Sequence, residues 1–96
     1  MRIEIKEKMV VKKLICEILN FDINNPIHGI SIDSRNIKKN DLFIAMKGSR
    51  SHGSDFVNND VLDKVSLIVS DKFIDSPKAV KVLDSYEFLK NIAIDF

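Results

Sequence analysis

The sequence is poor in the residues that build disulfides, linkers and disordered tails. Cysteine occurs once in 96 residues, as Cys16, so an internal disulfide is excluded. Cys16 lies in an apolar helical pattern, where we expect a small buried hydrophobic residue rather than a reactive thiol. Only three glycines and two prolines accompany 45% hydrophobic and 30% charged residues, a composition typical of an ordered soluble domain.

Neither an excess of charge nor a long apolar run is present. Fifteen basic residues stand against fourteen acidic ones, which leaves a formal net charge of +1. Such a balance provides no overall field to recruit nucleic acid or an anionic membrane, so any anion site must be local. No apolar run approaches the ~18 residues of a membrane-spanning helix, and the N-terminus lacks the features of a signal peptide. We therefore expect a cytoplasmic protein.

The motifs of several common chemistries are also missing. The two histidines, His28 and His52, have no partner at the spacing of a helical metal site, so no metal ligand is predicted. The G-x-x-x-x-G-K-[ST] loop that cradles nucleotide phosphates is absent, as is the G-x-G-x-x-G dinucleotide motif. No nucleophile with an adjacent base is visible either. We expect no catalytic residue and no cofactor in this chain, and no ATP hydrolysis by it alone.

Hydrophobic periodicity predicts helices alternating with strands. Apolar residues recur at helical spacing near the start, in the middle and at the end of the chain, while shorter apolar runs lie between them. Asn40 lies in a turn where a left-handed backbone is expected. The order α, β, β, α, β, β, α predicts one α/β domain over residues 1–96, with a small mixed sheet flanked by helices. The expected helices are 9–19, 55–64 and 84–96, and the expected strands are 30–33, 41–46, 65–71 and 78–83.

Two polar segments follow neighbouring predicted strands. D-S-R occupies residues 33–35, and G-S-R-S-H-G occupies residues 48–53. In open α/β sheets ligands collect where strands end, and glycines, serine hydroxyls and the fork of Arg50 suit an anion. From the residues alone, both segments can also be read as ordinary surface turns. Asp33 would then accept hydrogen bonds from the turn that follows it or pair with Arg35, and Ser34 would cap the turn.

Taken in order, these segments resemble a known family. D-S-R, then N-D-L-F-I-A-M-K-G, then H-G-S-D-F-V closely resemble the N-terminal domain of the Mur ligases, which extend the peptidoglycan stem peptide. The resemblance is good over residues 28–69. It implies a MurE/MurF N-terminal domain fold that holds the UDP end of a UDP-N-acetylmuramoyl-peptide. Separate ATPase and C-terminal domains, absent from this chain, would perform the ligation in the cytoplasm with ATP and Mg²⁺.

The resemblance also implies which residues bind the ligand. In the MurE type, contacts to uridine diphosphate fall at the residue before D-S-R, at its serine, and on three residues after the glycine of A-x-x-G. Ile32 would offer apolar surface and backbone groups to uracil, and Ser34 would offer a hydroxyl. The following loop would donate hydrogen bonds toward the diphosphate. The UDP-binding residues implied in this sequence are Ile32, Ser34, Ser49, Arg50 and Ser51.

Departures from the family pattern leave alternatives open. Asn40 stands where a glycine is usual, and His52 stands where an aspartate is usual. The ending L-K-N-I-A-I-D-F resembles the MurE segment that leads into the ATPase domain, which favours MurE, the diaminopimelate- or lysine-adding type, over the MurF type. The chain stops shortly before the expected phosphate loop, as an isolated first domain or a truncated product would. The remaining alternative is an interaction module that binds no nucleotide.

Overall fold

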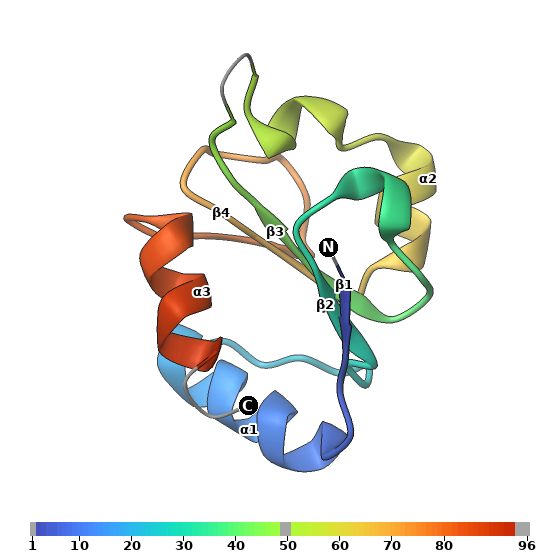
Figure 1. Cartoon of the computed structure of the whole chain (residues 1–96), viewed down its shortest axis with the longest axis vertical. Coiled ribbons are helices and arrows are strands. Elements are labelled where there is room, and N and C mark those ends of the chain that lie inside the picture. The colour runs from blue at the N-terminus through green and yellow to red at the C-terminus, as the bar shows by residue number, and fades with distance from the viewer. Residues whose placement is uncertain (1, 49–50, 94–96) are drawn as a thin grey trace.

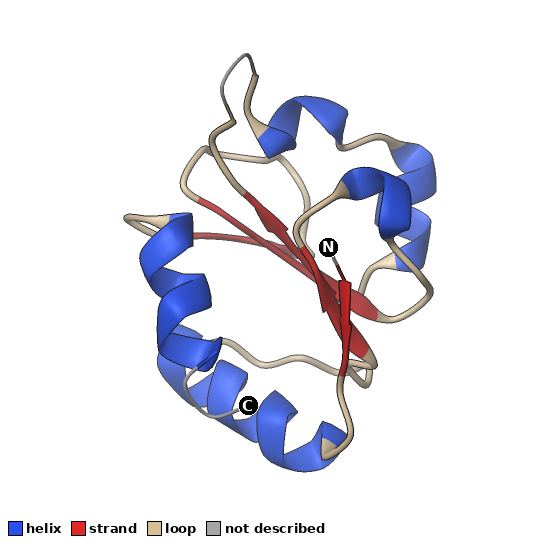
Figure 2. Ribbon diagram, in the orientation of Figure 1, coloured by secondary structure: helices blue, strands red, loops and turns tan. Residues whose placement is uncertain are grey.

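The strands form one mixed sheet with helices on both faces (Figures 1 and 2). The computed structural model describes residues 2–48 and 51–93. The strands lie in chain order, β1 being antiparallel to β2 and all other neighbours parallel, which confirms the predicted mixed α/β sheet. Their bounds are β1 (Arg2–Glu4), β2 (Gly29–Ser31), β3 (Asp41–Ala45), β4 (Leu67–Ser70) and β5 (Ala79–Lys81).

The helices divide between the two faces of the sheet, as Figure 2 shows. On one face lie α1 (Lys8–Leu19) and α3 (Ser85–Ala93). On the other face lie α2 (Asn59–Lys64) and two single-turn 3-10 helices, η1 (Ser34–Asn36) and η2 (Gly53–Phe56). Both faces of the central strands are therefore covered.

The central strand β3 supplies side chains to both hydrophobic layers. All five of its residues are buried, as expected for its continuous apolar run. Leu42 and Ile44 join the cluster formed with α1 and α3, whereas Phe43 and Ala45 join the cluster under α2. Successive side chains of a strand point to opposite faces, so one short apolar segment anchors both layers.

Three element predictions needed correction. Strand β1 was missed, because a three-residue segment with two charged side chains carries no periodic signal. The helix expected over 55–64 is instead η2 followed by α2, separated by Val57 and Asn58, and Asn58 caps α2 by accepting the N–H of Val61 at 3.0 Å. Strand β2 ends at Ser31 rather than near Asp33, since the polar turn begins there.

The predictions for Asn40 and Cys16 agree with the structure. Asn40 has a φ of 65°, the left-handed conformation expected of it. Cys16 is half-buried in α1 and packs against the core cluster as a hydrophobic residue. Within residues 2–48 and 51–93, no helix is long and apolar enough to cross a membrane.

Candidate functional site

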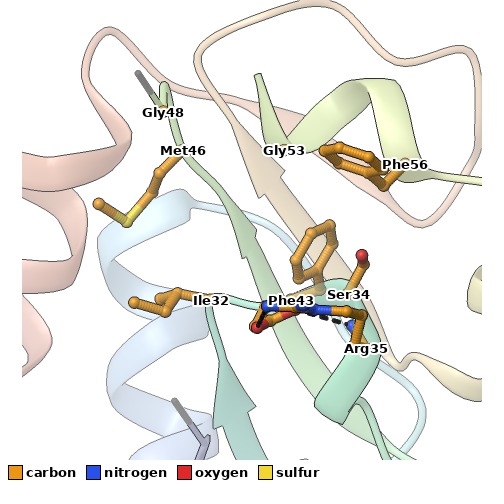
Figure 3. A pocket seen from close by; sticks show the side chains of 9 residues that line it. Ile32, Ser34, Arg35, Phe43, Met46, Gly48, Gly53 and Phe56 are labelled. Carbon is orange, nitrogen blue, oxygen red and sulfur yellow. Dashed lines mark hydrogen bonds and ion pairs between the residues drawn. The ribbon is translucent and has the colours of Figure 1, made fainter. Parts of the chain in front are cut away.

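The ends of β2 and β3 meet at one edge of the sheet and enclose a cavity there. Because these strands run parallel and are paired in register, the segments that follow Ser31 and Ala45 leave the sheet side by side. The cavity between them measures about 450 Å³. Figure 3 shows the side chains around it. Its lining residues are Ile32, Asp33, Ser34, Arg35, Phe43, Met46, Gly48, Gly53 and Phe56.

The cavity combines apolar surface with a polar rim. Ile32 and Met46, which pack toward the α1 and α3 cluster, and the rings of Phe43 and Phe56 on the other side provide the apolar surface. Phe43 is fully buried beneath it, whereas Phe56 is 52% exposed. Backbone groups at two glycines and the polar side chains after β2 complete the rim. An arrangement of this kind suits a flat, partly apolar ligand that carries a polar or anionic group.

The D-S-R segment is built around a carboxylate that organises its own turn. Asp33 Oδ1 accepts hydrogen bonds from the backbone N–H of Arg35 at 2.9 Å and from its Nε at 3.1 Å, while Oδ2 accepts one from Nη2 at 2.9 Å. The Arg35 side chain, and then its backbone N–H, lower the pKa of Asp33 from 3.8 to about 2. The alternative of a local Asp33–Arg35 pair is therefore realised, and the turn still lies against the cavity.

This pairing predicts an unusual titration for Asp33. We expect its carboxyl ¹³C resonance to titrate with a midpoint of about 2, as the hydrogen bonds from Arg35 favour the charged form. Since this pKa is depressed on folding, the stabilisation from Asp33 is complete above its ordinary pKa of 3.8 and disappears as the pH falls through about 2.

Arg35→Ala should raise that midpoint only part of the way, because the backbone N–H bond remains. Lys39→Ala, which removes a positive charge outside the pair, should leave it unchanged. A wild-type midpoint at the ordinary value would show that the ion pair does not form in solution.

The predicted ligand residues fall into three groups. Ile32 and Ser34, which the resemblance implies as ligand-binding residues, both line the cavity. Ser49 and Arg50 lie outside the residues that the structure describes. Ser51 lines a neighbouring hollow of about 520 Å³, on which Gly48 also borders. The backbone N–H of Gly48 donates to Ser51 O at 2.7 Å and closes the bend between them.

Sequence reasoning missed two features of the site. Phe43, Met46 and Phe56 line the cavity, although their apolar patterns predicted only core positions. His52 is buried and its Nε2 lies 2.5 Å from Asp71 Oδ1. The departure of His52 from the family pattern was the available signal, but nothing local in the sequence pointed to a partner 19 residues away.

No candidate metal centre is found in the described part of the chain, where no group of three or more His, Cys, Asp or Glu residues could hold an ion. Asp33 and Asp71, two of the carboxylates near this edge, are engaged by Arg35 and His52.

The chain is similar to known proteins both in sequence and in structure. The model of the Mur ligase family, described as its catalytic domain, matches residues 26–72. The UDP-N-acetylmuramoyl-L-alanyl-D-glutamate–2,6-diaminopimelate ligase of Clostridium tetani is 41% identical over 76 residues, which cover 79% of this chain and 16% of that protein. The chain thus spans only a small part of this relative.

Solved MurF ligases share the fold. The enzyme from Acinetobacter baumannii aligns with a TM-score of 0.69 at 21% identity, covering 84% of this chain and 19% of that one. The enzyme from Thermotoga maritima, solved in complex with ADP, aligns with a TM-score of 0.61 at 25% identity, covering 69% and 16%. The D-S-R turn and both cavity glycines fall inside the matched residues 26–72, and the chain belongs to the Mur ligase family.

Proposed function

We propose that this domain binds the UDP end of UDP-N-acetylmuramoyl-L-alanyl-D-glutamate, as the N-terminal substrate-binding domain of an ATP-dependent peptidoglycan ligase. The observation that supports it best is the cavity at the ends of β2 and β3. It brings Ile32 and Ser34 of one segment together with Gly48 and Gly53 of the other. Residues 14 or more positions apart in the chain thus share one hollow at the place where α/β sheets usually bind ligands.

The chemistry of the lining suits the two halves of a uridine diphosphate. Uracil is flat and partly apolar, so it would lie against Ile32 and the exposed ring of Phe56, with the hydroxyl of Ser34 at its polar edge. The diphosphate would lie toward the bend at residues 48–53, where glycine permits close approach of backbone N–H groups. Ser49, Arg50 and Ser51 enter this proposal through the family resemblance.

A second part of the proposal concerns the type of ligase and therefore the amino acid that it adds. The Clostridium tetani relative is a diaminopimelate-adding ligase, which favours the MurE type. The solved structures that this chain resembles are MurF ligases, but at 21% identity this likeness shows a shared fold and does not identify the type of ligase. We favour the MurE type and retain MurF as the second candidate.

The remaining steps of ligation are assigned to other parts of such an enzyme. Under this proposal the chain is catalytically inactive alone, and its partners are the muramoyl-peptide substrate and the ATPase and C-terminal ligase domains. ATP and Mg²⁺ would act in the ATPase domain, because this sequence has no phosphate loop. The cytoplasmic location also stays a prediction.

A titration with UDP followed by amide NMR tests the proposal. We expect UDP at millimolar concentration to shift the amide resonances of residues 32–35 and 48–53, since both segments border the cavity. Affinity should be weak, because a ligand held by isolated loops must offset the cost of ordering them. ADP should produce smaller shifts at residues 32–35, where the base is proposed to lie.

Arg50→Ala serves as the variant and Lys13→Ala as its control. If the Arg50 guanidinium contacts the diphosphate, its loss should weaken UDP binding by about 1 to 3 kcal/mol. Lys13→Ala removes the same charge from the exposed surface of α1 and should leave affinity unchanged. If UDP leaves residues 32–35 and 48–53 unmoved, the proposal is wrong and the domain is better regarded as an interaction module.

A further inference from the structure

The two hydrogen-bonding partners of the neutral His52 ring favour one of its tautomers. The residue is only 4% exposed and forms the N-cap of η2. Its Nδ1 accepts the backbone N–H of Ser54 at 3.0 Å, so Nδ1 carries no hydrogen. In the neutral ring the hydrogen is therefore on Nε2, which lies 2.5 Å from Asp71 Oδ1. One tautomer satisfies both contacts at once.

Asp71 connects this ring to two further elements. It follows directly after β4, and its Oδ2 accepts the backbone N–H of Ser85, the first residue of α3, at 3.5 Å. Burial would raise the pKa of Asp71, but the hydrogen bonds from His52 and the Ser85 backbone outweigh it and lower the pKa. Asp71 is thus a carboxylate acceptor, and His52 joins η2 to the ends of β4 and α3.

The cavity wall depends on where this connection places η2. Gly53 and Phe56 are the first and last residues of η2, and both line the cavity. The N–H of Gly53 donates to Met46 O at 2.8 Å. A Cβ at Gly53 would lie 3.0 Å from Ala45 Cα, so η2 packs closely on the end of β3. A shift of His52 would therefore move two lining residues together.

An aspartate at position 52, the usual residue in the resembling family, could not make the same connection. Its short side chain could accept the Ser54 N–H as an N-cap, but it has no donor for Asp71 and would place a second negative charge near it. The imidazole supplies both an acceptor and a donor. The hydrogen bond between His52 and Asp71 is therefore separate from the capping of η2, and it depends on the imidazole of this chain.

We propose that His52, with its hydrogen on Nε2 and bonded to Asp71, is a positioning residue for the cavity ligand. It holds Gly53 and Phe56 where a nucleoside diphosphate would contact them, and it acts on the ligand through these two residues. This inference rests on the proposed function, since its readout is UDP affinity. It differs from a purely structural cap because the bond to Asp71, and not the bond to Ser54, is the one that controls affinity.

Two amide substitutions separate the two hydrogen bonds of the ring. His52→Asn keeps an acceptor near the Nδ1 position but has no donor that reaches Asp71. His52→Gln carries an amide N–H near the Nε2 position and so keeps the contact with Asp71. We expect His52→Asn to weaken UDP binding by about tenfold, and His52→Gln to bind UDP clearly more tightly than His52→Asn. The ring ¹⁵N resonances of the wild type should show Nδ1 unprotonated and Nε2 protonated.

Asp71→Ala tests the same bond from its other end. This variant should weaken UDP binding to a similar degree, and the double variant His52→Asn/Asp71→Ala should be no weaker than the poorer single variant. If His52→Asn does not fold, as judged by its thermal melt, Asp71→Ala alone carries the comparison with wild type.

The outcomes distinguish this inference from the proposed function. The role of His52 is overturned if His52→Asn or Asp71→Ala binds UDP as tightly as wild type, or if His52→Asn binds UDP more tightly than His52→Gln. Either result leaves the proposal of UDP binding intact. A ring hydrogen on Nδ1 also overturns the role of His52. A wild type that shows the expected ring state but no UDP response at residues 32–35 and 48–53 overturns the proposed function, and the positioning role with it.

Discussion

Replacing Arg2 by methionine is expected to lower the free energy of unfolding by about 3 to 5 kcal/mol. Arg2 Nε donates to Asp41 Oδ2 at 2.6 Å, and Nη2 donates to Oδ1 at 2.7 Å. The Asp41 side chain is completely buried. Among the described residues its one further hydrogen-bond donor is the backbone N–H of Lys38 at 2.9 Å, which cannot compensate for the lost guanidinium. The variant would leave a buried carboxylate without its counter-charge.

The path of the Arg2 side chain explains why the pair forms. Arg2 is on the edge strand β1 and Asp41 is on β3, so the guanidinium must cross β2. It crosses at Gly29, where a Cβ would lie 2.5 Å from Arg2 Nη2 and 2.9 Å from Asp41 Oδ1. The hydrogen bond to Asp41 raises the pKa of Arg2 further, so the guanidinium stays charged at every ordinary pH.

Chemical unfolding followed by circular dichroism measures the effect, with Glu4→Gln as the matched control. Glu4 also pairs with Arg2, and Arg2 lowers the pKa of Glu4, but the Glu4 side chain is mostly exposed and the pair is screened by water. Glu4→Gln should therefore change stability very little. Equal, small effects of Arg2→Met and Glu4→Gln would show that the buried pair does not hold β1 to the sheet.

The second large effect is expected from Phe43→Ala, which should destabilise the fold by about 3 to 5 kcal/mol. Phe43 is fully buried in the cluster under α2, where it packs with Val61, Val65 and Ile68. Its truncation removes apolar contacts and leaves a space that the surrounding β-strands cannot fill. A domain of this size has only about 5 to 15 kcal/mol of stability, so a large share would be lost.

Phe73→Ala is the matched control for Phe43→Ala. Phe73 is 76% exposed after β4, so the same chemical change should alter stability by less than about 0.5 kcal/mol. Both variants should be melted without ligand, because Phe43 also lines the cavity and would affect binding. If Phe43→Ala lowers the melting temperature no more than Phe73→Ala does, the core position assigned to Phe43 is contradicted.

Elements with a strong local pattern could be predicted from the sequence. The apolar run of β3 predicted a strand buried on both faces, and helical spacing predicted α1 to within a residue. Strand β1 could not be predicted, because Arg2 and Glu4 are typical of an exposed segment and its support comes from Asp41, 39 residues away from Arg2. The split of the middle helix depends on the caps at His52 and Asn58, which compete with the helical pattern.

The candidate site was predictable where residues adjoin strand ends. Placing D-S-R and the glycine bend after neighbouring parallel strands was enough to expect one edge for both, and Ile32 and Ser34 do border the cavity. Ser51 instead lines the adjoining hollow, on which Gly48 also borders. The His52–Asp71 contact joins segments separated by α2 and β4, so only the folded chain shows it.

A crystal structure of this chain grown with uridine diphosphate tests the central claim most directly. We predict the uracil ring against Ile32 and Phe56, with Ser34 at its edge and the diphosphate at the bend of residues 48–53. Density for the nucleotide elsewhere, for example beside β5 or α1, with the cavity between β2 and β3 left free of it, would contradict the account.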